Sequence, residues 1–281
     1  MTLVAPTDLL GTARDQRRSV GAFNVIQLEH AEAYVRAAER TGLAVVLQVS
    51  ENTVRYHGAL EPLALACVAI ARRAAAPVVV HLDHAEDTSL VAEAVALGFT
   101  SVMYDGATLP YEENVARTRD VVRHCRAAGV SVEAELGEVG GKDGAHAPGV
   151  RTDPREAAAF VEATGVDALA VAVGTSHAMT DRSAVVDLAL VRALAAAVPV
   201  PLVLHGSSGV DDDGLAACAR AGTAKINIAT RLNQVMTAEV RRRLAADERV
   251  SDPRRYLGPA RDAVVDEVAA LQRLLWREGE P

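Results

Sequence analysis

Histidines and carboxylates stand together where several short apolar runs of this sequence end. The 281-residue chain has eight histidines, and four of them (His81, His84, His177 and His205) follow such runs. Three imidazoles around one open coordination position form a catalytic zinc site. We therefore predict that His84, His177 and His205 bind Zn²⁺. His81 shares a strand face with Asp83 and is expected to play a structural part instead.

Carboxylates beside these histidines are candidates for proton transfer and metal binding. Asp83 directly precedes His84, and burial that raised its pKa would make it a general acid/base. Alternatively, Asp83 orients a metal-bound imidazole. Glu135 is a candidate metal-facing carboxylate. Glu133 lies on the same side of its strand, so one of these two glutamates could instead be solvated or salt-bridged.

Two segments of small and polar residues are candidates for binding a phosphate. They are Gly206-Ser207-Ser208 and Asn227-Ile228-Ala229-Thr230. Small residues let backbone N–H groups approach an anion, and the hydroxyls supply further donors. Because both segments follow late apolar runs, they predict a phosphorylated ligand.

The elements that must position these residues follow a regular alternation. Short runs rich in Val, Ile and Leu are apolar on both faces, which is typical of buried parallel strands, and Ala-rich amphipathic helices separate them. The strands are predicted at Val20–Val25, Ala44–Ser50, Val78–Leu82, Ser101–Asp105, Ser131–Leu136, Ala168–Val173, Pro201–His205 and Lys225–Thr230. Helices are predicted at Leu28–Thr41, Glu61–Ala74, Thr88–Leu97, Tyr111–Ala128, Pro154–Thr164, Leu188–Ala197 and Gly214–Ala221.

Eight strands with a helix after each indicate an α/β fold, the (β/α)₈ or TIM barrel. Catalytic residues of this fold lie at the carboxyl ends of the strands, where the polar residues above are found. We expect residues 1–281 to form a single barrel domain. Residues 232–281 are expected to be a helical extension that packs on the barrel or on a neighbouring subunit.

Composition excludes several classes of protein. The net charge of −8, from 29 basic and 37 acidic residues, argues against nucleic-acid binding and against a basic membrane surface. We find no signal peptide and no apolar run of about 18 residues. The three cysteines are far apart, so we expect neither disulfides nor a cysteine zinc site. The protein is predicted to be cytoplasmic, and its apolar exterior predicts a homo-oligomer.

Six motifs follow one another along the chain, and their order is typical of one enzyme family: HLDHA, SVMYDGA, EAELGEVGG, GTSHAM, VLHGSSG and KINIAT. With them, the chain resembles the class II (zinc-dependent) ketose-bisphosphate aldolases from about residue 21 to about residue 265. That family includes fructose- and tagatose-1,6-bisphosphate aldolases. The resemblance implies a lyase that reversibly cleaves a phosphorylated ketose to dihydroxyacetone phosphate and an aldehyde.

The resemblance also implies roles for individual residues. Asp83 would act on the substrate hydroxyl at the cleaved bond. The three histidines would hold the zinc, and Glu135 matches a carboxylate near an alternative metal position. Ser50 matches a residue near the substrate carbonyl. The segments 206–208 and 227–230 would hold the dihydroxyacetone phosphate half, with Asn227 hydrogen-bonded to the enediolate. A monovalent cation, Na⁺ or K⁺, would lie near that phosphate.

The residues available favour a metal-dependent mechanism over a lysine Schiff base. Cleavage builds negative charge on two substrate oxygens, and a metal ion can stabilise that charge as a Lewis acid. A Schiff base needs a desolvated lysine at the barrel mouth. The chain has two lysines only. Lys225 is expected at the opposite end of the barrel, and Lys142 lies in the loop after the fifth strand.

Three positions depart from the family pattern. Asp143 stands where a glutamate is usual, in the loop that supplies the base for the proton at C3. Ala178 replaces a glycine that makes a backbone contact, and Ala107 replaces a small polar residue. Ala229 favours tagatose over fructose bisphosphate. The arginine for the distal phosphate could be any of Arg231, Arg254, Arg255 and Arg261.

Two alternatives remain open at this point. One is an aldolase for another keto-sugar phosphate, such as a deoxy-keto-gluconate phosphate. The other is a non-catalytic barrel that binds a sugar phosphate, although such a barrel has no need for a Lewis acid beside a carboxylate.

Overall fold

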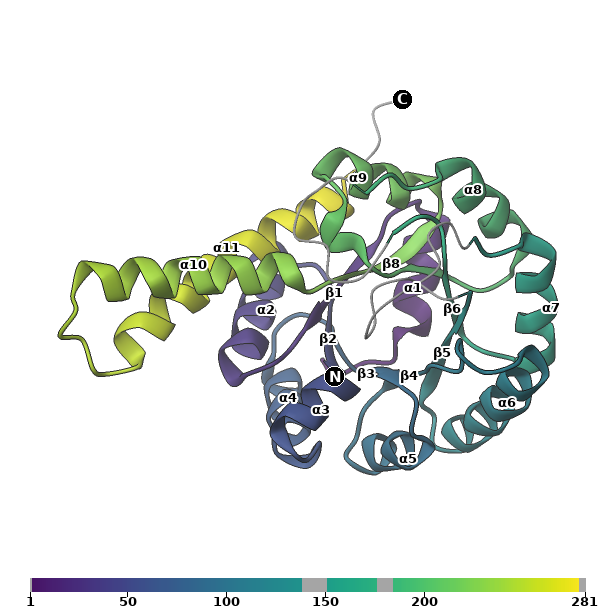
Figure 1. The fold of residues 1–281 in the computed structure, drawn as a ribbon, viewed down its shortest axis with the longest axis horizontal. Coiled ribbons are helices and arrows are strands. Elements are labelled where there is room, and N and C mark those ends of the chain that lie inside the picture. The colour runs from purple at the N-terminus through teal and green to yellow at the C-terminus, as the bar shows by residue number, and fades with distance from the viewer. Residues whose placement is uncertain (1, 138–150, 176–183, 278–281) are drawn as a thin grey trace.

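A computed structural model of the chain describes residues 2–137, 151–175 and 184–277. Eight parallel strands pair in chain order, and β1 pairs with β8, so the sheet is a closed barrel surrounded by helices (Figure 1). The strands are β1 Val20–Asn24, β2 Val45–Ser50, β3 Val78–Ala85, β4 Ser101–Tyr104, β5 Ser131–Leu136, β6 Ala168–Val171, β7 Leu202–Leu204 and β8 Thr223–Ile228. The predicted TIM barrel is confirmed.

The helices on the outside of the barrel agree closely with the sequence pattern. They are α2 Leu28–Thr41, α4 Glu61–Arg73, α5 Thr88–Ala96, α6 Tyr111–Ala127, α7 Pro154–Thr164, α8 Leu188–Ala197 and α9 Asp212–Ala221. Gly42 and Gly165 end α2 and α7 in the left-handed conformation that favours glycine, with φ of 72° at each. The short helix α3, Glu51–His57, follows β2 directly and was not predicted.

A further helix that was not predicted, α1 (Pro6–Asp15), closes the amino-terminal end of the barrel. Leu10 and Ala13 of α1 pack with small apolar residues inside the barrel, such as Ala22 and Ala224. A larger apolar cluster fills the space between the sheet and the outer helices. Small apolar residues therefore fill much of the barrel interior next to α1, where Thr7 of α1 also bonds to Ser131 of β5.

Two long helices form the predicted extension. α10 (Thr230–Ala246) and α11 (Arg254–Leu275) make a hairpin whose outer end extends away from the barrel (Figure 1). α11 packs against α2, and ion pairs join these helices: Arg36 with Asp262, Arg40 with Asp266, and Arg261 with Glu32. In the part of the chain that the structure describes, no helix is long and apolar enough to cross a membrane.

Candidate active site

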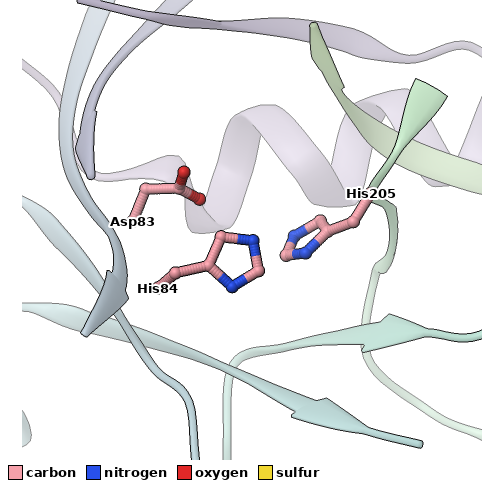
Figure 2. A group of neighbouring side chains, drawn as sticks. All are labelled: Asp83, His84 and His205. Atoms are coloured by element: carbon pink, nitrogen blue, oxygen red, sulfur yellow. The ribbon is translucent and has the colours of Figure 1, made fainter. Parts of the chain in front are cut away.

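An irregularity in β3 brings Asp83 and His84 into the same site. Consecutive residues of a regular strand point to opposite faces of the sheet. The register between β3 and β4 shifts between Leu82 and Ala85, and His84 has a φ of 50°, which is uncommon for a residue other than glycine. Bulges of this kind can redirect a side chain beside an active site. Both side chains consequently point into the barrel mouth (Figure 2).

His205 approaches the same point from the opposite side of the barrel. It follows β7 and is fully buried, and its ring meets that of His84 edge to face with the centroids 4.6 Å apart (Figure 2). Asp83, His84 and His205 each offer a metal-ligating atom within 4.8 Å of the others. A second group with the same spacing consists of His84, Asp105 and Glu135.

The structure thus brings together four of the residues predicted to act at the metal: Asp83, His84, Glu135 and His205. The third predicted ligand, His177, lies outside the described residues. Asp143 and Ala178 lie outside them as well.

Each of the two described histidines is hydrogen-bonded to carboxylates. His84 Nδ1 lies 2.7 Å from Asp105 Oδ2. His205 lies between two glutamates, with Nδ1 3.0 Å from Glu135 and Nε2 3.0 Å from Glu133. Burial alone would lower the pKa of His205, but the hydrogen bonds to Glu133 and Glu135 outweigh it and raise that pKa to about 9.

Charge at the site favours a bound cation. Asp83, Asp105, Glu133 and Glu135 are all buried, whereas the one lysine or arginine buried among the described residues is Lys225. Isolated buried carboxylates are costly unless they are paired or coordinate a metal. Imidazole and carboxylate donors suit Zn²⁺. The residues present therefore fit a divalent zinc ion.

Burial is not the only influence on the pKa of Asp83. Burial tends to raise its pKa, as expected, but the nearby charges of His84, His205 and Lys225 outweigh burial and lower the pKa to about 2. The condition set from the sequence, that burial raises this pKa, is not met, because these neighbours act in the opposite direction. At neutral pH Asp83 is a carboxylate, and so it can accept a proton.

Side-chain amides hold the Asp83 carboxylate in place. Asn24 Nδ2 donates to one oxygen at 3.2 Å, and Asn227 Nδ2 donates to the other at 3.3 Å. Gln48 Nε2 in turn donates to Asn24 Oδ1 at 2.7 Å. Asn227 Oδ1 is buried and has no hydrogen-bond partner among the described residues, so it can accept a hydrogen bond from a ligand hydroxyl.

Several residues of this site were not among the predicted ones. Asn24, Gln48 and Asp105 join the network around Asp83 and His84, and Glu133 and Lys225 join it below His205. The sequence signal that could have identified these residues is a polar residue within an apolar strand. That signal does not reveal the partner, because the partner lies on another strand.

His81 contacts residues outside the group of Asp83, His84 and His205. Its Nδ1 is 2.8 Å from Ser101 Oγ, and its Nε2 is 3.4 Å from Lys225 Nζ. Burial is the main cause that lowers the pKa of His81, to about 3. The ring of His81 is therefore neutral at neutral pH.

The two predicted phosphate segments lie side by side. Gly206, with a φ of 64°, leads into a short 3₁₀ turn at Ser207–Gly209. Ser207 Oγ donates to the carbonyl of Asn227, and Ser208 Oγ accepts from the backbone N–H of Ala229. Thr230 begins α10, whose amino-terminal N–H groups and helix dipole favour an anion.

Ser50 and three of the four candidate arginines have other partners in this structure. Ser50 is paired in register with Asp83 and caps α3, where its hydroxyl accepts from Thr53 N at 3.2 Å. Arg231 pairs with Asp212 and Glu267. Arg254 pairs with Asp252, and Arg261 pairs with Glu32. These three arginines are thus engaged with carboxylates.

The fold and this site together define a class: a TIM barrel with histidines and carboxylates at its mouth that could hold a metal ion. Residues 4–280 match the family model described as fructose-bisphosphate aldolase class-II. The chain is 41% identical to a probable fructose-bisphosphate aldolase of Bacillus subtilis over 97% of both chains. It is 37% identical to the fructose-bisphosphate aldolase of Geobacillus stearothermophilus over 100% of this chain and 99% of the other.

A solved structure agrees with these sequence matches. The YdjI aldolase of Escherichia coli K12 superimposes with a TM-score of 0.87 at 29% identity, and the match covers 99% of this chain and 98% of the other. The chain belongs to the class II fructose-bisphosphate aldolase family, and it is an enzyme, a carbon–carbon lyase. The alternative of a non-catalytic barrel is therefore wrong.

Proposed function

We propose that the chain is a zinc-dependent aldolase that reversibly cleaves fructose- or tagatose-1,6-bisphosphate to dihydroxyacetone phosphate and an aldehyde. The observation that carries this proposal is the group of Asp83, His84 and His205, whose ligating atoms lie within 4.8 Å of one another at the barrel mouth. Membership of the class II aldolase family supports the same reaction.

Zinc would be held by His84, His177 and His205, and Glu135 would serve an alternative metal position. When bound, the ion supplies a Lewis acid for the two substrate oxygens on which negative charge grows. Four buried carboxylates and two imidazoles converging from different strands support a divalent cation there.

Asp83 would take the proton from the substrate hydroxyl at the cleaved bond. Its lowered pKa keeps it ionised at neutral pH, and the amides of Asn24 and Asn227 orient both carboxylate oxygens. Asn227 would also hydrogen-bond the enediolate, for which its buried Oδ1 and its amide N–H are suitably placed. Ser50 would lie near the substrate carbonyl, since it is paired with Asp83 across β2 and β3.

The dihydroxyacetone phosphate half would be bound by Gly206, Ser207 and Ser208 together with segment 227–230. The contacts between these two segments and the start of α10 support this role. A Na⁺ or K⁺ ion would lie near the phosphate. Asp143 would exchange the proton at C3, and Ala178 would contribute a backbone contact.

The sugar is the part of the proposal that most needs measurement. Ala229 favours tagatose bisphosphate, whereas the relatives named above are fructose-bisphosphate aldolases. We would compare kcat/KM for fructose bisphosphate, tagatose bisphosphate and a deoxy-keto-gluconate phosphate by the release of dihydroxyacetone phosphate. Ala229→Asp serves as the matched variant and is expected to shift preference toward fructose bisphosphate. The failure of all three substrates to release this product would overturn the proposal.

We further propose that residues 1–281 act as one barrel domain, in the cytoplasm, as a homodimer or homotetramer. The packing of α11 on α2 supports the extension as part of that domain. Its projecting outer end is suited to contact another subunit.

A further inference from the structure

A buried ion pair lies directly below the proposed zinc site and reaches one of its ligands. Lys225 on β8 is only 2% exposed, and its Nζ is 2.7 Å from Glu133 Oε2. The other oxygen of Glu133 is 3.0 Å from His205 Nε2. Lys225 was expected at the far end of the barrel. Its amine instead lies in the interior, two residues before Asn227 on the same strand face.

The chemistry of these groups sets the direction of each hydrogen bond. A lysine ammonium has donors only, and an ionised carboxylate has acceptors only. Lys225 therefore donates to one oxygen of Glu133, and the other oxygen accepts from His205 Nε2–H. A histidine with its hydrogen on Nε2 has Nδ1 as its available metal donor. That Nδ1 lies 3.0 Å from Glu135, and a metal ion would replace the hydrogen that it shares with this carboxylate.

We propose that Lys225 and Glu133 are positioning residues for the metal: Lys225 orients the Glu133 carboxylate, and Glu133 holds His205 so that Nδ1 is presented to the ion. This inference rests on the proposed zinc site. A carboxylate that accepts from a metal-bound histidine typically changes metal affinity by about 10- to 100-fold when it is removed. Neither residue touches the substrate in this role.

The decisive comparison uses two double variants that lack the buried charge pair. Glu133→Gln with Lys225→Met keeps an oxygen that can accept from His205 Nε2–H. Glu133→Leu with Lys225→Met has a similar volume but no acceptor. Zinc affinity is measured by competition with a chromophoric chelator, on protein shown to be folded by circular dichroism. We expect the Leu variant to bind zinc about 10- to 100-fold more weakly than the Gln variant.

The single variant Glu133→Gln tests the part played by Lys225. With the ammonium present, the Gln oxygen is drawn to Lys225, and the NH₂ group faces His205 Nε2. That arrangement favours the ring form with hydrogen on Nδ1, which opposes metal binding. Removing the ammonium by Lys225→Met lets the amide turn over. We therefore expect the double variant to bind zinc more tightly than the single variant, whereas a merely structural pair predicts that the second substitution brings no recovery.

Ser101→Ala is the matched control, because Ser101 belongs to the same buried network but bonds to His81 rather than to His205. It is expected to lower the unfolding temperature and to leave zinc affinity unchanged. Equal affinities of the Gln and Leu double variants would overturn the positioning role alone. Absence of zinc binding by the wild-type protein would overturn the zinc site and this role with it.

An independent measurement needs no variant at all. In a crystal structure of the zinc-loaded wild-type protein, His205 Nδ1 should bind the ion, and Nε2 should remain within hydrogen-bond distance of Glu133. Coordination through Nε2, or separation of Glu133 from His205, would overturn the proposal even if a variant failed to fold.

Discussion

Replacing Asp83 with asparagine separates proton transfer from metal binding. The substitution keeps the shape of the side chain but removes the base. A positioned acid/base contributes about 10²- to 10⁴-fold to a rate. We therefore expect kcat for bisphosphate cleavage to fall by that factor, which corresponds to about 3–5 kcal/mol of transition-state stabilisation at 1.36 kcal/mol per tenfold. Zinc should remain bound, because His84 and His205 are unchanged.

The structure also sets the expected cost in stability. Both oxygens of Asp83 accept from amides, at 3.2 Å from Asn24 and 3.3 Å from Asn227. The introduced NH₂ group cannot accept, so one of these donors loses its partner, at a cost of about 1–3 kcal/mol. For a chain of 281 residues the unfolding entropy is about 0.6 kcal/mol per kelvin. The unfolding temperature should therefore fall by about 2–5 °C.

The assay couples the release of dihydroxyacetone phosphate to NADH oxidation and measures zinc per chain on the same sample. If the Asp83→Asn variant retains zinc and keeps more than a tenth of the wild-type kcat, Asp83 is not the base. Loss of zinc together with activity would show that Asp83 is a ligand, since its carboxylate lies within reach of the same ion.

Four further predictions concern other parts of the molecule. Chelation should abolish cleavage and added zinc should restore it, and full activity of the metal-free protein would contradict the proposed site. Asp143→Asn should slow hydrogen exchange at C3 of dihydroxyacetone phosphate, and exchange at the wild-type rate would place this base elsewhere. Light scattering at micromolar concentration should give two or four times the 29.5 kDa chain mass, and a monomer would contradict the predicted assembly. Burial lowers the pKa of His30 to about 4, so the neutral ring is favoured in the fold, and stability present above pH 6.5 should decline by about 3 kcal/mol as the pH falls to 4. Urea unfolding of His30→Gln should lack this part of the decline, and an unchanged pH profile would refute the assignment.

Local sequence determined the barrel and the place of its active site. Runs such as Ser131–Leu136 and helices such as Leu28–Thr41 were bounded correctly, because strand burial and helix amphipathicity repeat over a few residues and glycine marks the helix ends. Short βαβ steps then allow few topologies, and polar residues at strand ends must meet at one mouth. The sequence alone therefore sufficed to predict that His84 and His205 lie close together.

Relations between distant residues were decided by the tertiary structure. The final strand begins at Thr223 rather than Lys225, and this shift places the lysine inside the barrel beside Glu133. The bulge in β3 turns Asp83 and His84 toward one point, although strand periodicity alone would separate them. Likewise, the low pKa of Asp83 depends on charges from other strands. Electrostatic interactions act through space over a few ångströms, and such distances between strands are set by barrel closure and not by neighbours along the chain.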